Sequence, residues 1–185
     1  MAATILGELG NKMKDTVVGV LKGADEVYDT LFNTVRDNVV ALLEGAGDVT
    51  TTAVENVRDI VVGALKGAGD VGSTGTEAVS GVVKGTLKGV SEAGGDVGSL
   101  VKHTVSSAVV GASEVGADVT DAAVKAVQGA IDAVKEVGGD AGTATTDAVT
   151  GAIEAVGEVA SGSVETVKDV LGTSVDGAKD VIEKL

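Results

Sequence analysis

The chain repeats itself with a period of 22 residues, and this repeat constrains the fold more than any other feature. The segment Asn33–Val49 (NTVRDNVVALLEGAGDV) recurs as Glu55–Val71 (ENVRDIVVGALKGAGDV), and columns of apolar residues continue this register in both directions. Every step is 22 residues except one of 26. We therefore divide the chain into seven tandem units over residues 1–162, with a four-residue insertion near 84–89, and a C-terminal helix with an 11-residue repeat over 163–185.

The spacing of apolar residues within one unit predicts helices. From Val49 to Val71 the apolar positions are three or four residues apart. Six turns in 22 residues correspond to about 3.67 residues per turn, which favours a right-handed supercoil. A parallel β-solenoid is the alternative, but it would need apolar residues at alternate positions, and these columns do not alternate. We expect an all-α fold of long amphipathic helices with right-handed or nearly straight coiled packing.

A glycine-rich joint recurs once in each unit and leaves two interpretations open. The joints are Gly45–Asp48, Gly67–Asp70, Gly94–Asp96, Gly116–Asp118 and Gly138–Asp140. Gly followed by Asp is the pattern of a helix stop and a new N-cap, which would give about seven short helices in a bundle or solenoid. Because the apolar phase runs straight through each joint, we favour continuous helices, weakened by about 1 kcal/mol per Gly relative to Ala. The best candidate for a reversal, which would form an antiparallel hairpin, is Val90–Gly98, and the second is Gly72–Thr76.

The composition excludes several classes of function. The net charge is −14, and no cluster of Lys or Arg offers a surface for nucleic acid or for an anionic membrane. There is no Cys, and His103 is the only histidine, so we expect no enzyme, no metal and no cofactor. No apolar run of about 18 residues predicts a membrane span. No signal peptide is visible in Met1–Leu21, so we expect a cytoplasmic protein, with extracellular assembly left open.

Three local patterns could be taken for a nucleotide site, a metal site and a packing anchor. Gly67–Gly72 matches the dinucleotide fingerprint G-x-G-x-x-G, but the sister joint Gly45–Thr50 lacks the third Gly, so we interpret the match as a product of the repeat. An Asp column without the D-x-D-x-D-G spacing of a calcium loop is expected to cap or solvate the joints. Its members are Asp48, Asp70, Asp96, Asp118 and Asp140. Tyr28 and Phe32, the only aromatic residues, lie four apart and are expected to anchor the packing of the N-terminal part.

The tandem amphipathic pattern resembles the class that includes synucleins, exchangeable apolipoproteins and late-embryogenesis-abundant proteins. The resemblance lies in the 11/22-residue period and covers nearly the whole chain. The segments nearest to the synuclein unit K-T-K-E-G-V are Val164–Asp169 (VETVKD) and Gly85–Val90 (GTLKGV), and the proline punctuation of apolipoproteins is absent. The resemblance implies a chain that coats lipid or becomes ordered on drying or binding. The net charge departs from the lipid-binding members, whose apolar face is usually flanked by Lys.

The apolar stripe of Val, Ala and Gly is the expected functional surface. Small residues let helix backbones approach closely, whereas helices on lipid surfaces use bulky side chains with basic flanks. We therefore expect a non-enzymatic structural protein that self-assembles through the stripe into a bundle, stalk or filament, with itself as partner. The alternatives are a phasin-like or droplet-type coat of a neutral lipid or polymer inclusion, and a chain that folds on binding. The stripe consists of Val27, Val35, Val39, Val49, Val57, Val61, Val71, Val79, Val83, Val97, Val105, Val109, Val119, Val127, Ile131, Val149 and Ile153.

Overall fold

The computed structural model describes residues 7–22, 26–46, 51–73 and 75–185, and these segments are mainly helical. The α-helices are α1 (Glu8–Leu21), α2 (Val27–Ala46), α3 (Thr51–Asp70), α4 (Thr76–Glu92), α5 (Val97–Glu114), α6 (Val119–Glu136), α7 (Ala141–Val159), α8 (Val164–Ser174) and α9 (Ala178–Ile182), with a 3-10 helix η1 (Ser161–Ser163) before α8. No strand occurs in these segments, so the all-α prediction is confirmed.

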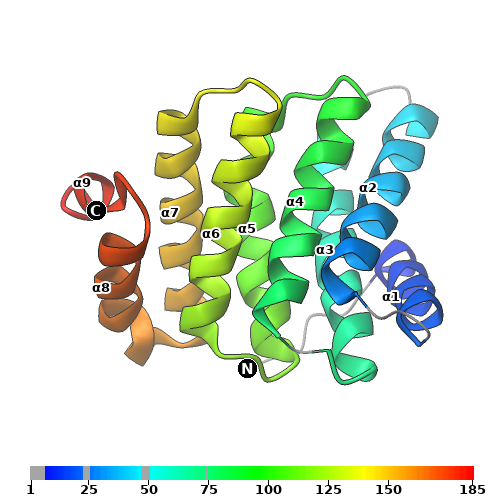
Figure 1. Ribbon diagram of the computed structural model, residues 1–185, viewed down its shortest axis with the longest axis horizontal. Coiled ribbons are helices and arrows are strands. Elements are labelled where there is room, and N and C mark those ends of the chain that lie inside the picture. Colours follow the sequence, from blue (N-terminus) through cyan, green and yellow to red (C-terminus); the bar gives the residue numbers. More distant parts are fainter. Residues whose placement is uncertain (1–6, 23–25, 47–50, 74) are drawn as a thin grey trace.

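The helices form two layers. Among the helices that follow it, each helix from α1 to α5 packs most extensively against the second one: α1 against α3, α2 against α4, and so on to α5 against α7. The helices α1, α3, α5 and α7 form one layer, and α2, α4, α6 and α8 form the other, in a row that ends at α9 (Figure 1). This arrangement is an α-solenoid, in which each unit contacts only nearby units. We call the packing of two such helices the same-layer contact.

The glycine-rich joints Gly94–Asp96, Gly116–Asp118 and Gly138–Asp140 are turns, so the expectation of long helices that run through them is wrong. Gly67–Asp70 is the last part of α3, with the turn directly after it, and Gly45–Asp48 lies partly outside the described residues. Gly72, Gly94, Gly116 and Gly138 have φ between 77° and 80°, the left-handed conformation in which glycine terminates a helix. The next amide closes the turn: the N–H of Gly95 donates to the carbonyl of Val90 at 2.8 Å. The reversals expected near 90–98 and 72–76 do occur, but they belong to a series and do not form one central hairpin.

Three members of the Asp column, Asp96, Asp118 and Asp140, lie directly before the next helix, whereas Asp70 ends α3 and Asp48 lies outside the described residues. Asp118 Oδ1 accepts a hydrogen bond from the Asp121 amide at 3.0 Å, and Asp140 Oδ1 accepts one from the Thr143 amide at 2.8 Å. These two members of the Asp column therefore act as N-caps, as expected. One period of 22 residues consists of one helix and one turn. A continuous helix would also complete about six turns in 22 residues, so the period alone does not distinguish the two arrangements. The C-terminal segment is likewise divided, into α8 and α9 on either side of Gly177 with φ +81°.

Small side chains make up most of the core, and glycines let the helices approach closely. The buried residues are mostly Val and Ala. A Cβ added at Gly85 of α4 would lie 2.5 Å from the Phe32 carbonyl oxygen of α2, and one added at Gly151 of α7 would lie 2.5 Å from the Lys102 carbonyl oxygen of α5. Real Cβ atoms are essentially never that close to another heavy atom. The prediction that small residues permit close helix packing is confirmed.

Candidate functional site

The structure places the predicted stripe inside the chain. Eleven of its residues are buried in the core: Val35, Val39, Val57, Val61, Val79, Val83, Val105, Val109, Val127, Ile131 and Val149. Val27, Val71, Val97, Val119 and Ile153 are partly buried and pack against that core, and Val49 lies outside the described residues. In this fold the stripe therefore joins helices of one chain. The surfaces left for a partner are the outer faces and the two ends of the array.

The same-layer contact is the feature that the structure repeats most regularly. Gly81, Gly85 and Gly89 lie four residues apart on the face of α4 that meets α2. A Cβ at Gly81 would lie 2.9 Å from the Tyr28 carbonyl oxygen, and one at Gly89 would lie 2.8 Å from that of Arg36. On α3, Gly63 packs against the backbone of Gly10 in α1. Each glycine thus provides a flat surface on which the backbone of the earlier helix rests.

An ion pair accompanies each same-layer contact from α1–α3 to α5–α7. The pairs, which we call the ion-pair ladder, are Lys14–Asp70 (2.8 Å), Arg36–Glu92 (3.7 Å), Lys66–Glu114 (2.6 Å), Lys84–Glu136 (2.6 Å) and Lys102–Glu154 (2.9 Å). The helices α3 to α6 each end at the acidic residue of their pair. A negative charge at a helix C-terminus is unfavourable, because the helix dipole is negative there. The basic side chain from the earlier helix offsets this charge.

The titration of the ladder is affected most clearly where α4 meets α6. The Lys84 ammonium group donates to Glu136 and lowers the pKa of that carboxyl group, and the positive charge of Lys88 adds to the effect. The same hydrogen bond raises the pKa of Lys84. At the next turn, the backbone amides of Thr143 and Gly142 lower the pKa of Asp140, which caps α7. These charges hold the ends of neighbouring helices in register.

The two aromatic residues lie in α2, on the side that meets α4. The rings of Tyr28 and Phe32 stack with their centroids 6.2 Å apart and their planes at 7°. The Arg36 guanidinium group lies 5.6 Å from the Phe32 ring centroid and also reaches Glu92 of α4. The backbone of both residues contacts the glycines of α4, whereas their side chains are half-buried and do not belong to the core, so the role of the rings as a packing anchor stays a prediction.

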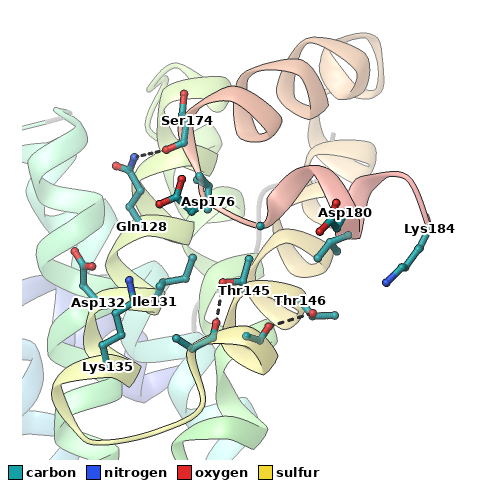
Figure 2. Close-up of a pocket in the computed structure, with 15 residues that line it drawn as sticks. Gln128, Ile131, Asp132, Lys135, Thr145, Thr146, Ser174, Asp176, Asp180 and Lys184 are labelled. Atoms are coloured by element: carbon teal, nitrogen blue, oxygen red, sulfur yellow. Dashed lines mark hydrogen bonds between the residues drawn. The ribbon is translucent and has the colours of Figure 1, made fainter.

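A groove of about 750 Å³ lies between α6, α7 and the turn that joins α8 to α9 (Figure 2). Asp132, Asp176 and Asp180 line it together with Lys135 and Lys184. Its polar groups are partly engaged within the chain: for example, the side-chain amide of Gln128 donates to the Ser174 carbonyl at 3.4 Å. In the described part of the chain, no three His, Cys, Asp or Glu side chains are placed to hold a metal ion.

The single histidine borders a smaller groove of about 260 Å³ between α3, α5 and α7. His103 is exposed there, near Glu55, Arg58 and Glu158. The G-x-G-x-x-G match at Gly67–Gly72 falls on the end of α3 and its turn, and a helix precedes it where a dinucleotide site needs a strand.

Sequence reasoning did not identify the ion-pair ladder, although it left a signal. Glu92, Glu114 and Glu136 are 22 residues apart, and each lies four residues before the Asp of a joint. An acidic residue repeated at a helix end indicates a basic partner nearby, because the helix dipole disfavours it there. The sequence does not reveal which helix supplies that partner.

Comparisons with known proteins add no identity. No family model, no curated protein and no solved structure matches this chain. Among the described helices, none has both the length and the apolar character needed to cross a membrane.

Proposed function

We propose that the chain is a non-enzymatic structural protein that assembles with further copies of itself. In this proposal the stripe builds the folded unit, and the contact between units uses other surfaces. The observation that carries it is the same-layer contact, which recurs from α1–α3 to α5–α7 with the same two components: a glycine against a backbone and an ion pair. Helices of this sequence are therefore suited to recognise helices of the same sequence, which favours self-assembly as the role of the repeat.

The alternative of a lipid or polymer coat lacks an observation in its favour. Among the described residues, the exposed large hydrophobic side chains are Val20 and Leu185, which are 40% and 59% exposed. Such scattered residues do not form an apolar patch that would bind a surface. A coat would require the helices to separate and the stripe to turn outward. It remains a prediction, and binding to neutral lipid emulsions would support it.

Sedimentation equilibrium of the native chain, with circular dichroism of the same samples, tests the proposal. We expect a helical protein with a concentration-dependent mass above that of one chain. A chain that is helical and monomeric from micromolar to millimolar concentration would contradict the proposal.

A pair of variants tests whether the stripe is a core or an interface. Val61→Asp places a charge at a fully buried position and should abolish the helical signal. Val20→Asp makes the same change at an exposed position and should leave the helical signal unchanged. If Val61→Asp dissociates an assembly and stays fully helical, the stripe is the interface and our account of it is wrong.

A further inference from the structure

The outward faces of α1 and α2 keep glycines at positions that later helices use for the same-layer contact. Gly19 precedes Gly63 by two repeats (63 − 19 = 44), and Gly45 precedes Gly89 by two repeats (89 − 45 = 44). Gly63 and Gly89 lie against the backbone of an earlier helix, whereas nothing lies within 4 Å of a Cβ built at Gly19 or Gly45. Both glycines carry the cost of about 1 kcal/mol of a helical Gly relative to Ala. In the described residues, no close neighbour requires them.

An apolar side chain is exposed on the same face of α1. Val20 is 40% exposed, whereas the residues that follow it in register, such as Ala64 of α3, Ala112 of α5 and Val156 of α7, are completely buried. Burial of this position is thus the rule in the later helices of its layer. Because the position is apolar but uncovered in α1, the face is suited to a further layer of helix.

The ion-pair ladder also has an open position at this edge. Glu44 lies four residues before the Asp of its joint, as do Glu92 in α4 and Glu136 in α6. Those two residues pair with a base from the helix two places earlier, Arg36 and Lys84. No described helix lies two places before α2, and Glu44 is exposed. Counted from its joint, Glu44 is an acidic group at the position where α4 and α6 use one, although in the 44-residue register of Gly45 and Gly89 it corresponds to Lys88.

We propose that this edge surface, formed by Gly19, Val20, Ala41, Glu44 and Gly45, docks the same surface of a second copy of the chain. The proposal rests on the proposed self-assembly and specifies where it occurs. The argument is continuity: the faces on α1 and α2 match, by register, the faces that the chain covers with its own helices from α3 onward. Inside the chain such a glycine face meets the opposite face of an earlier helix, whereas in this pair the glycine faces of the two copies meet each other, and the small residues on both sides allow their backbones to approach.

The charges and the other end of the array favour a symmetric pair. Lys12 and Asp15 are exposed on α1 and Lys22 directly after it, and Glu44 and Asp37, which pairs with Arg36 of its own helix, are exposed on α2. A two-fold axis that places α1 beside the partner's α2 brings these opposite charges together. The C-terminal end is covered in part by α8 and α9 and has the polar residues Asp132 and Lys135. It therefore offers no matching face for head-to-tail growth, and an isologous contact closes at two copies.

Polar residues on the same faces limit the strength of this contact. Thr16 of α1 and Asn38 of α2 occupy the position that is apolar and fully buried in later helices, such as Ile60 and Val82. The edge surface is therefore partly wet, unlike the contacts inside the chain. We expect a reversible dimer that dissociates on dilution.

The decisive variant replaces both glycines, Gly19→Gln with Gly45→Gln. Because both positions face open space, the longer side chains fit the single chain without a clash and improve its helix propensity. In the dimer they would separate the two faces. We expect an unchanged helical signal, a thermal midpoint equal to or above that of the native chain, and loss of the dimer in sedimentation equilibrium.

The control is Gly157→Gln in α7, an exposed helical glycine whose added Cβ would lie 4.0 Å from its nearest neighbour, Val164. This variant should remain as dimeric as the native chain. If the native chain assembles and the double variant assembles equally well, the edge surface is not the interface, although self-assembly stands. If the native chain is monomeric at every concentration, both proposals are wrong.

Discussion

The first two helices and the middle of the array share one repeat but differ in what covers them. In α3 and α4, glycines such as Gly67 and Gly85 lie against the backbone of α1 and α2. In α1 and α2, glycines in the same register face open space. A glycine therefore has opposite effects in the two regions. In the middle it permits a close approach that any side chain would block, and at the edge it only weakens its own helix.

The same contrast holds for another position of the repeat, which lies near the middle of each of the first four helices. Ile60 and Val82 are completely buried, whereas Thr16 and Asn38 occupy that column at the edge. Asn38 donates a hydrogen bond to the Thr34 carbonyl within α2 at 2.8 Å. Residues in the same register therefore lie on the same face of their helices, but only those that a neighbouring helix buries must be apolar.

Exchanging residues between the two regions should have the largest effect. Val82→Asn places in α4 the residue that α2 has at this position. Its side-chain NH2 can bond the carbonyl four residues earlier, as that of Asn38 does, but its side-chain oxygen is buried without a partner. We expect a loss of about 2–4 kcal/mol in the free energy of unfolding, because a buried polar group loses its hydrogen bonds to water. The reverse change, Asn38→Val, should leave the stability of the single chain nearly unchanged. Urea denaturation followed by circular dichroism measures the free energy of unfolding of both variants. If the two substitutions change it equally, the two regions do not differ in this respect.

Adding one methyl group to a glycine should have a smaller effect in the middle. A Cβ in Gly85→Ala would lie 2.5 Å from the Phe32 carbonyl oxygen, so α2 and α4 must move apart. Overpacking of this kind typically costs about 1–3 kcal/mol. Thermal or urea unfolding of the variant measures the cost. A variant as stable as the native chain would show that the helices are not in close contact.

The same substitution at the edge should have the opposite sign. Gly45→Ala meets no atom within 4 Å and removes a flexible residue from α2. We expect a gain of about 0.5–1 kcal/mol in the stability of the single chain. The measurement should use dilute protein, so that any effect on association does not contribute. A destabilised Gly45→Ala monomer would mean that a segment of the same chain covers this face.

The ion-pair ladder should contribute least. Lys84 lowers the pKa of Glu136 below its ordinary value of 4.5, so the folded state holds this carboxylate in its charged form. The stabilisation is present above pH 4.5 and is lost as the pH falls through the lowered pKa. Because the pair is partly exposed, Glu136→Gln should cost at most about 1 kcal/mol at neutral pH. The difference from the native chain should disappear in acid, and a constant difference across this range would argue against the pair.

Much of the local structure could be predicted from the sequence, but its long-range arrangement could not. The three- and four-residue spacing of apolar residues correctly indicated helices, and the Gly-Asp pairs carried the signal of a stop and a cap. The apolar phase that runs through the joints favours continuous helices. A turn at each joint lets every helix bury two or more of its faces against its neighbours, and the free energy of this packing favours the turns over a continuous helix. Gly94 and Asp96 therefore sit at a turn where phase alone favoured an unbroken helix.

The partner of each helix was beyond the reach of the sequence. Every unit has nearly the same pattern, so the period does not tell whether Gly85 faces α2, another unit or a second chain. The stripe was predicted as an assembly surface, and in this fold its described residues pack within the chain. The column of Glu92, Glu114 and Glu136 indicated basic partners without showing that they come from two helices earlier.

The central claim is the same-layer contact, and a single distance tests it most directly. Lys102 of α5 and Glu154 of α7 form an ion pair with 2.9 Å between Nζ and Oε2, although 52 residues separate them in the sequence (154 − 102 = 52). The chain has no Cys, so Lys102→Cys with Glu154→Cys allows two spin labels to be attached at these positions alone. Pulsed electron–electron double resonance is measured on the doubly labelled chain, diluted with unlabelled native chain. It should give one short distance between the two spin labels, as expected for labels on two helices in contact. A continuous helix would separate the two positions by about 78 Å at ~1.5 Å per residue. A distribution centred near that length, or one that is short only when labelled chains are concentrated, would contradict the account.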